Sequence, residues 1–224
     1  MAHLLHLDAS PRPASFSRRV GAAFVDEWRQ AHPDSAYTYR DLTADPVPLV
    51  DAARTELAAQ SSAAGVRELA GMAAVVRTEP QRAAWDVARA LIEEVLAADV
   101  LLLATPMYNF SVPGALKAWI DQISFPWLSF ENRAVVVVTG RGGSYAPGTP
   151  RAHLDFQEPY LRAYFETLGA ERIDFIHAEL SNAPIVPFLA QFTDAHIQSV
   201  NHALGAARTL ARTLPAQVPT AATA

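Results

Sequence analysis

The sequence predicts an α/β protein built on a doubly wound, five-stranded parallel sheet with helices on both faces. Two observations predict it: five short segments of strand length recur along the chain, and segments with helical periodicity separate them. The chain has 224 residues, which suits one large domain with a sizeable core. We place this domain at residues 1–212.

The first half of the chain supplies two of the strands and three of the helices. The predicted strands lie at residues 3–8 and 36–41. The predicted helices lie at residues 16–31, 51–69 and 78–97. The first helix ends before Pro33, and the helix at 51–69 is only weakly specified. Thr78 and Gln81 fit a capping box with Pro80 between them, so a helix begins there.

The second half alternates strands and helices in the same way. The predicted strands lie at residues 99–105, 133–139 and 172–178. The predicted helices follow them at residues 115–125, 149–168 and 193–212. The strand at 99–105 is almost wholly apolar, as expected of a strand covered on both faces. Pro113 suits the first turn of a helix, and Gly169 suits the end of one. Residues 213–224 are small, proline-containing and uncharged, and we expect this tail to be disordered.

Composition and charge exclude several classes of protein. A net charge of -5 without a run of Lys and Arg argues against a nucleic-acid binder, which needs a basic face. Without cysteine, the chain can hold no disulfide, iron–sulfur cluster, zinc thiolate site or thiol nucleophile. The N-terminus is too short and too charged for a signal peptide, and Asp99 interrupts the apolar stretch around Leu101. We therefore expect a cytoplasmic protein that neither enters a membrane nor binds nucleic acid.

The loop after the first strand, SPRPASFSRR, places hydroxyl groups around the start of a helix. Ser10, Ser15 and Ser17 add donors to the free backbone N–H groups and the dipole of the helix N-terminus. Ligands of doubly wound sheets bind beyond the carboxyl ends of the strands, so this loop is placed to bind an anion. The alternative is that Ser15 or Ser17 only caps the helix.

Two further loops at the same edge are unusual. The loop PMYNFSVPG sets four large or polar side chains between two prolines, namely Met107, Tyr108, Asn109 and Phe110. The loop GRGGSYAPG fails the dinucleotide pattern G-x-G-x-x-G at Tyr145 and lacks the lysine of a Walker A loop. Its small side chains would let a flat ligand approach, although a plain turn explains the glycines equally well. Together, the three loops fit flavin mononucleotide (FMN), which has a phosphate at one end and a flat ring at the other.

No residue pattern predicts a metal site or a dedicated acid or base. His3 and His6 are three apart on a strand, so they point to opposite faces and cannot share a metal ion. The other histidines lack a carboxylate partner at helical spacing, and there is no G-x-S-x-G elbow.

The quoted loops resemble those of the FMN-dependent NADH azoreductase family, flavodoxin-like homodimers that also reduce quinones. The matching segments are SPRPASFS, PMYNFSVPGALKAWIDQI, VVVVTGRGGSYAPG and FQEPYLRAYFETLGAERIDF. The similarity covers most of residues 3–210, and MYNF followed by a helix and RGG is its specific part. The resemblance implies a flavodoxin-like FMN-binding domain.

The resemblance also implies which residues hold the two ends of FMN. The phosphate and ribityl chain would contact Ser10, Ser15, Phe16 and Ser17. The isoalloxazine ring would contact Met107, Tyr108, Asn109, Phe110, Gly140, Arg141, Gly142 and Gly143. The family often has serine where this chain has Gly140, so a hydroxyl contact is lost there, while backbone contacts could persist.

The family reaction is ping-pong: NADH or NADPH reduces FMN, and a quinone or azo compound then takes two electrons. Asn109 and nearby backbone N–H groups would favour the anionic reduced ring, and no side chain need act as acid or base. Flat acceptors would stack in a pocket shared across the dimer and lined by Phe125, Trp127, Phe130 and Tyr145. The alternative is that Trp127 and its neighbours form dimer core, and the two roles are compatible. The apolar run ISFPWLSF also predicts a homodimer, because such a run exposed on a monomer would promote association.

Other functions fit the same fold. A flavodoxin-like single-electron carrier would bind FMN without being an enzyme, but such proteins tend to be shorter and more acidic. An NAD(P)H-dependent flavin or quinone reductase would differ only in its acceptor. A regulatory protein would need an acidic pocket, whereas the first strand ends in the single Asp8. The natural acceptor and the preference for NADH or NADPH stay open.

Overall fold

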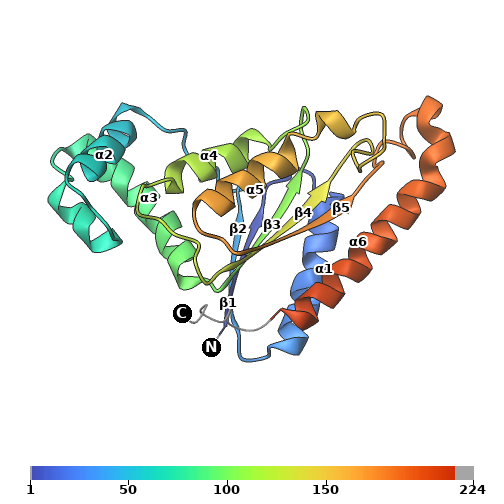
Figure 1. Ribbon diagram of the computed structural model, residues 1–224, viewed down its shortest axis with the longest axis horizontal. Helices are drawn as coiled ribbons and strands as arrows, with labels where there is room; N and C mark the ends of the chain where they lie inside the picture. Colours follow the sequence, from blue (N-terminus) through green and yellow to red (C-terminus); the bar gives the residue numbers. More distant parts are fainter. Residues whose placement is uncertain (1, 215–224) are drawn as a thin grey trace.

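In this computed structural model, which describes residues 2–214, five parallel strands form one sheet in the order β2-β1-β3-β4-β5 (Figure 1). The strands are β1 (His3–Asp8), β2 (Ala36–Asp41), β3 (Val100–Pro106), β4 (Ala134–Gly140) and β5 (Arg172–Ala178). All neighbouring strands pair in parallel, so every strand ends at the same edge of the sheet. The predicted fold class is confirmed, and each predicted strand lies within one residue of an observed one.

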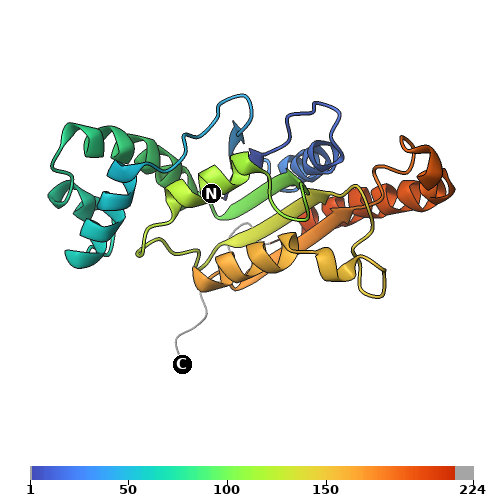
Figure 2. The same ribbon diagram turned by 90° about the horizontal axis from the view of Figure 1, so that it is seen from above.

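Helices cover both faces of the sheet (Figures 1 and 2). One face carries α1 (Phe16–Ala31) and α6 (Thr193–Thr213), and the other carries α3 (Glu79–Ala97), α4 (Gly114–Ile123) and α5 (Gln157–Thr167). The remaining elements are α2 (Ala52–Ala63), which packs against α3, and the short 3-10 helices η1 (Leu69–Ala74), η2 (Ala152–Leu154) and η3 (Pro187–Phe192). Within the described residues, no helix is long and apolar enough to span a membrane.

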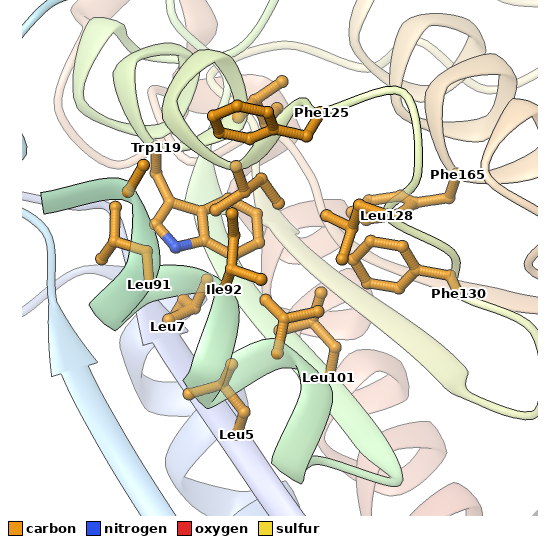
Figure 3. Close-up of a cluster of buried hydrophobic side chains, with 14 of the residues drawn as sticks. Leu5, Leu7, Leu91, Ile92, Leu101, Trp119, Phe125, Leu128, Phe130 and Phe165 are labelled. Atoms are coloured by element: carbon orange, nitrogen blue, oxygen red, sulfur yellow. The ribbon is translucent and has the colours of Figure 1, made fainter. Parts of the chain in front are cut away.

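The core lies on both sides of the central strands because these strands are apolar at nearly every position. β3 is buried along its whole length, and β4 is buried except at Gly140. The side chains alternate between the two faces, so Leu102 packs toward α1 while Leu101 packs toward α3. Figure 3 shows the cluster of buried side chains on the α3 face, in which Trp119 of α4 packs among leucines and phenylalanines.

The strand order reverses between β1 and β3, and this reversal decides where a ligand can bind. β1 pairs with β2 on one side and with β3 on the other, so the loops that leave β1 and β3 diverge to opposite faces. A crevice opens beyond the carboxyl ends of the strands at such a point. The loops after β1, β3 and β4 therefore meet at one edge, as the sequence predicts.

The helix predicted at residues 149–168 begins later than predicted. Turns and η2 precede α5, which starts only at Gln157. The carboxylate of Asp155 accepts hydrogen bonds from the backbone N–H groups of Gln157 and Glu158, at 3.0 and 3.1 Å. Asp155 therefore caps the N-terminus of α5, whereas the prediction placed this residue inside the helix.

Two other helix ends differ from the predictions. α2 stops at Ala63 because Gly65 follows with a φ of 65°, a left-handed conformation that ends helices. α6 continues to Thr213, and the side chain of Leu214 is buried against the fold. The rest of the predicted tail, residues 215–224, lies outside the described residues.

Candidate functional site

A cleft of about 250 Å³ lies at the carboxyl edge of the sheet. Its walls come from the loops after β1, β3, β4 and β5, and its lining residues are Ser10, Arg12, Ser15, Phe16, Pro106, Met107, Tyr108, Gly140, Gly142, Ser181 and Asn182. A larger cavity of about 780 Å³ lies on the other side of α1, over β2. We place the functional site in the smaller cleft, because only there do the three unusual loops of the sequence converge.

One end of the cleft is the N-terminus of α1. Ser15 occupies the N-cap position, but its hydroxyl makes no capping hydrogen bond. Instead, Ser15 Oγ lies 2.8 Å from Ser17 Oγ, and both side chains are buried. Among the described residues, the N–H groups of Phe16 and Ser17 have no hydrogen-bond acceptor. A helix N-terminus with unpaired N–H groups and two hydroxyls is suited to an anion such as a phosphate.

An arginine holds the loop that carries Ser10. Arg18 Nε donates to the carbonyl oxygen of Ser10 at 2.9 Å, and its Nη atoms donate to Asp8 at 3.0 Å and to Asp41 at 2.6 Å. Burial raises the pKa of Asp41, but hydrogen bonds from Thr43 and Arg18 outweigh burial and lower it to about 2. Arg18 therefore links β1, β2 and the serine loop in one ion-pair network. The sequence predicts no role for Arg18, because no local sequence pattern shows which carboxylates pair with it.

The other end of the cleft is the turn after β3. Tyr108 and Ser111 exchange two backbone hydrogen bonds of 3.0 Å, which makes a two-residue hairpin. Its central residues, Asn109 and Phe110, have φ values of 48° and 71°, the signs of a type I′ turn. Asparagine suits this conformation, whereas phenylalanine rarely adopts it. The surrounding structure must therefore hold the turn in place, as is common at functional sites.

Contacts from the start of α5 hold the turn. The backbone N–H of Phe156 donates to Phe110 O at 3.1 Å, and Gln157 Nε2 donates to Pro106 O at 2.9 Å. The Phe110 ring meets the ring of Tyr145 edge to face, with centroids 6.3 Å apart. Tyr108, Asn109 and Phe110 are exposed, so this end of the site is open.

Two glycines in the loop after β4 allow close approach of neighbouring segments. A Cβ atom on Gly140 would lie 3.2 Å from the backbone nitrogen of Ser17, so the bare glycine lets β4 end close against the start of α1. A Cβ atom on Gly142 would lie 2.6 Å from Asn182 Nδ2, so the exposed amide of Asn182 would have to turn aside. Gly140 therefore lets the end of β4 pack closely beside the α1 N-terminus.

The structure does not bring the side chain of Arg141 to the cleft. Its guanidinium is 1% exposed and donates to Thr139 Oγ1 at 2.9 Å and to Asp155 at 2.8 Å. Its backbone N–H donates to Ala178 O at 2.8 Å, and its carbonyl accepts from Ser181 N at 3.0 Å. Arg141 thus anchors the glycine loop to α5 and to the loop after β5.

The residues predicted to line an acceptor pocket divide into two places. Tyr145 is buried against the ring of Phe110, beside the turn after β3. Phe125 and Phe130 lie in the core shown in Figure 3, and the half-buried Trp127 stacks on Phe125 with centroids 5.6 Å apart. Phe125 also borders a separate groove of about 500 Å³ together with tyrosines of α5. The structure therefore does not bring these three aromatic residues to the cleft of the same protomer.

The apolar run ISFPWLSF, which suggested a homodimer, is largely covered within the chain. Phe125, Leu128 and Phe130 are all buried, because the segment turns back under α3 and α5. The premise that this run is exposed is therefore wrong, and the run does not by itself call for a second subunit.

The residues of the cleft fit FMN. The unpaired N–H groups and hydroxyls at α1 match a phosphate, and no carboxylate among residues 2–214 lines the cleft. Gly140 and Gly142 leave room for a flat ring, and the turn at Met107 and Tyr108 closes one side. The loop after β5, with Ser181 and Asn182, also lines the cleft, and sequence reasoning missed it. The only signal was a pair of polar residues just beyond the predicted strand.

Comparisons with known proteins agree with this fold and site. The family described as having a flavodoxin-like fold matches residues 2–200. An FMN-dependent NADH:quinone oxidoreductase of Nocardia farcinica is 51% identical over 213 residues, covering 95% of this chain and 99% of that protein. A protein of the same name from Frankia casuarinae is 40% identical over 224 residues, covering 93% and 98%.

Among solved structures, an FMN-dependent NADH-azoreductase of Bacillus anthracis in complex with FMN matches with a TM-score of 0.72. The match covers 94% of this chain and 100% of that chain at 20% identity, and at this identity it shows the shared fold alone. The family resemblance predicted from the three loops is confirmed. The chain belongs to the family with the flavodoxin-like fold, and within it to the FMN-dependent NADH:quinone oxidoreductases.

Proposed function

We propose that the protein is an FMN-dependent oxidoreductase that passes two electrons from NADH to quinones, with azo compounds as further acceptors. The cleft carries this proposal, because it combines N–H and hydroxyl donors suited to a phosphate with two glycines beside an aromatic turn. The relatives that bear this name match the chain over nearly its whole length and theirs, which supports a complete catalytic framework.

The residues would divide the binding of FMN between the two ends of the cleft. Ser10, Ser15, Ser17 and the N–H groups at the start of α1 would hold the phosphate by charge-assisted hydrogen bonds. Met107 N donates to Gly140 O at 2.9 Å, which ties the aromatic turn to the glycine loop around the ring. The N–H groups of Gly142 and Gly143 have no acceptor within the described residues and would face the ring's polar atoms.

FMN, when bound, supplies the hydride and electron chemistry of the reaction. The chain's own residues bind and orient it, exclude water from one face, and stabilise charge at the ring edge. We propose that Asn109 contributes to this stabilisation from the tip of its turn. The exposed ring of Phe110, supported from behind by Tyr145, would offer a flat acceptor an aromatic contact beside the cleft.

We further propose that the protein is a homodimer. Exposed apolar side chains from the turn before η3 to the start of α6 support this, since Ile185 is 65% exposed and Phe188 is 78% exposed, with Phe192 and Ile197 further along. Light scattering should give about twice the 24.2 kDa mass of one chain. A monomer at micromolar concentration would refute the dimer.

The test of the function is the absorption spectrum of the purified protein after addition of FMN. Bound flavin should be bleached by NADH or NADPH under nitrogen and restored by a quinone without leaving the protein. Restoration only by one-electron acceptors would instead support an electron carrier of the flavodoxin kind. Release of reduced FMN into solution would support a flavin reductase. A protein that ignores added FMN in calorimetry would refute all three.

A further inference from the structure

We propose that Asn182, on the loop after β5, contacts the ring of the bound flavin, and that Gly142 leaves the space in which its amide lies. This inference rests on the proposed function. Asn182 lines the cleft together with Met107 and Tyr108 of the turn after β3. Its amide occupies the space above Gly142, where an ideal Cβ would lie 2.6 Å from Nδ2, 3.1 Å from Cγ and 3.4 Å from Oδ1.

The backbone around Asn182 is fixed to the glycine loop. Its N–H donates to Gly142 O at 3.2 Å, and the preceding N–H groups of Leu180 and Ser181 donate to Gly143 O and Arg141 O at 3.1 and 3.0 Å. Leu180 has a φ of 59°, a left-handed conformation that a leucine keeps only when its surroundings hold it. The two loops therefore form one unit.

The side chain of Glu179 adds a second set of hydrogen bonds between the same two loops. Its carboxylate accepts hydrogen bonds from Ser144 Oγ at 2.6 Å and from the backbone N–H of Tyr145 at 2.8 Å. Its own N–H donates to Ser199 Oγ of α6 at 2.9 Å. The position of Asn182 is thus set by contacts that do not use its side chain.

The amide of Asn182 is free to bind a ligand. Within residues 2–214, neither Oδ1 nor Nδ2 makes a hydrogen bond, and the residue is exposed at the mouth of the cleft. A carboxamide offers a donor and an acceptor side by side. The flavin ring presents the complementary group, an imide edge with one N–H between two carbonyl oxygens. A fixed backbone with a free amide would bind this edge at little cost in conformational entropy.

The imide contact can be tested with three flavins and a substitution. Asn182→Ala should weaken the binding of FMN and of riboflavin by the same factor, roughly fivefold, because a neutral hydrogen bond is lost. Binding is measured by quenching of flavin fluorescence. With 3-methyl-FMN, which lacks the imide N–H, Asn182→Ala should have a clearly smaller effect. Asn201→Ala, an exposed asparagine of α6, is the matched control and should bind all three flavins normally.

A second pair of variants tests the role of Gly142. Gly142→Ala should weaken FMN binding, because its Cβ would push the Asn182 amide aside. The same substitution should cost less in the Asn182→Ala background, where the amide is absent. Thermal unfolding without flavin shows whether each variant is folded.

The outcomes separate this inference from the proposed function. If wild-type protein binds no flavin, the proposed function fails. If wild type binds FMN, and Asn182→Ala binds all three flavins as tightly as wild type, only the Asn182 inference is overturned. A changed KM for the quinone with unchanged flavin affinity also overturns it, because the amide would then face the acceptor.

Discussion

The two ends of the cleft are built in opposite ways. At the start of α1, Ser15 and Ser17 are 6% and 0% exposed, and Arg18 holds the nearby Ser10 loop while pairing with Asp8 and Asp41. At the turn after β3, Tyr108 and Phe110 are 41% and 37% exposed, and two residues hold left-handed conformations. The buried end is therefore suited to hold a ligand tightly, while the open end is suited to contact with reactants.

The largest effect on the buried end is expected from substitution of Arg18. Arg18→Ala should lower the free energy of unfolding by roughly 3 kcal/mol, because it leaves Asp8 and Asp41 without their cation. It should also weaken FMN binding, since the Ser10 carbonyl loses its donor. Urea unfolding and fluorescence titration measure the two effects. Arg19→Ala is the matched control on the exposed neighbouring residue, and equal effects of both substitutions would contradict the role of the ion-pair network.

Acid should also act on the buried strand that leads into this end, through His6 of β1. Burial and the nearby charge of Arg18 lower the pKa of His6 to about 4, below its ordinary value of 6.5. Neutral His6 therefore stabilises the fold above pH 6.5, and this contribution, roughly 3 kcal/mol at most, is lost as the pH falls to about 4.

The check is the slope of unfolding free energy against pH between 6.5 and 4. His6→Gln should flatten this slope, whereas His202→Gln, on the exposed face of α6, should not. A wild-type slope in the His6→Gln variant would mean that other groups account for the acid sensitivity.

A milder change at the buried end is Ser17→Ala. The hydroxyl is expected to donate to a dianionic phosphate, and a hydrogen bond of that kind contributes roughly 1.5 to 3 kcal/mol. FMN should therefore bind about tenfold or more weakly, while turnover at saturating FMN stays nearly normal. Fluorescence titration followed by steady-state kinetics separates the two. A large loss of turnover at saturating FMN would show that Ser17 does more than anchor.

The smallest expected effect on affinity is at the open end, at Asn109. Asn109→Gly removes the amide but suits the φ of 48°, so the type I′ turn should persist. We expect near-normal FMN affinity, a lower reduction potential and slower reduction by NADH in stopped-flow measurements. Reduction at the wild-type rate would make the MYNF turn a shape-fitting element only.

How far the sequence predicts this molecule depends on the range of the interactions. The strands follow from local apolar patterns, and the convergence of the three loops follows from parallel pairing at one edge. The side chain of Arg141, in contrast, turns away from the cleft because Asp155 lies close to it in space, 14 residues further on. The Arg18 network and the contact of Asn182 with Gly142 likewise join separate loops, so no local pattern signals them.

The most direct test of the contrast between the two ends is the ratio of the dissociation constants of riboflavin and FMN. If the buried end holds the phosphate through at least two charge-assisted hydrogen bonds, wild-type protein should bind FMN about a hundredfold or more tightly than riboflavin. Calorimetry at constant pH and salt gives both constants. Equal affinity for the two flavins would contradict the assignment of the α1 N-terminus as the phosphate site, and with it the division of labour between the two ends.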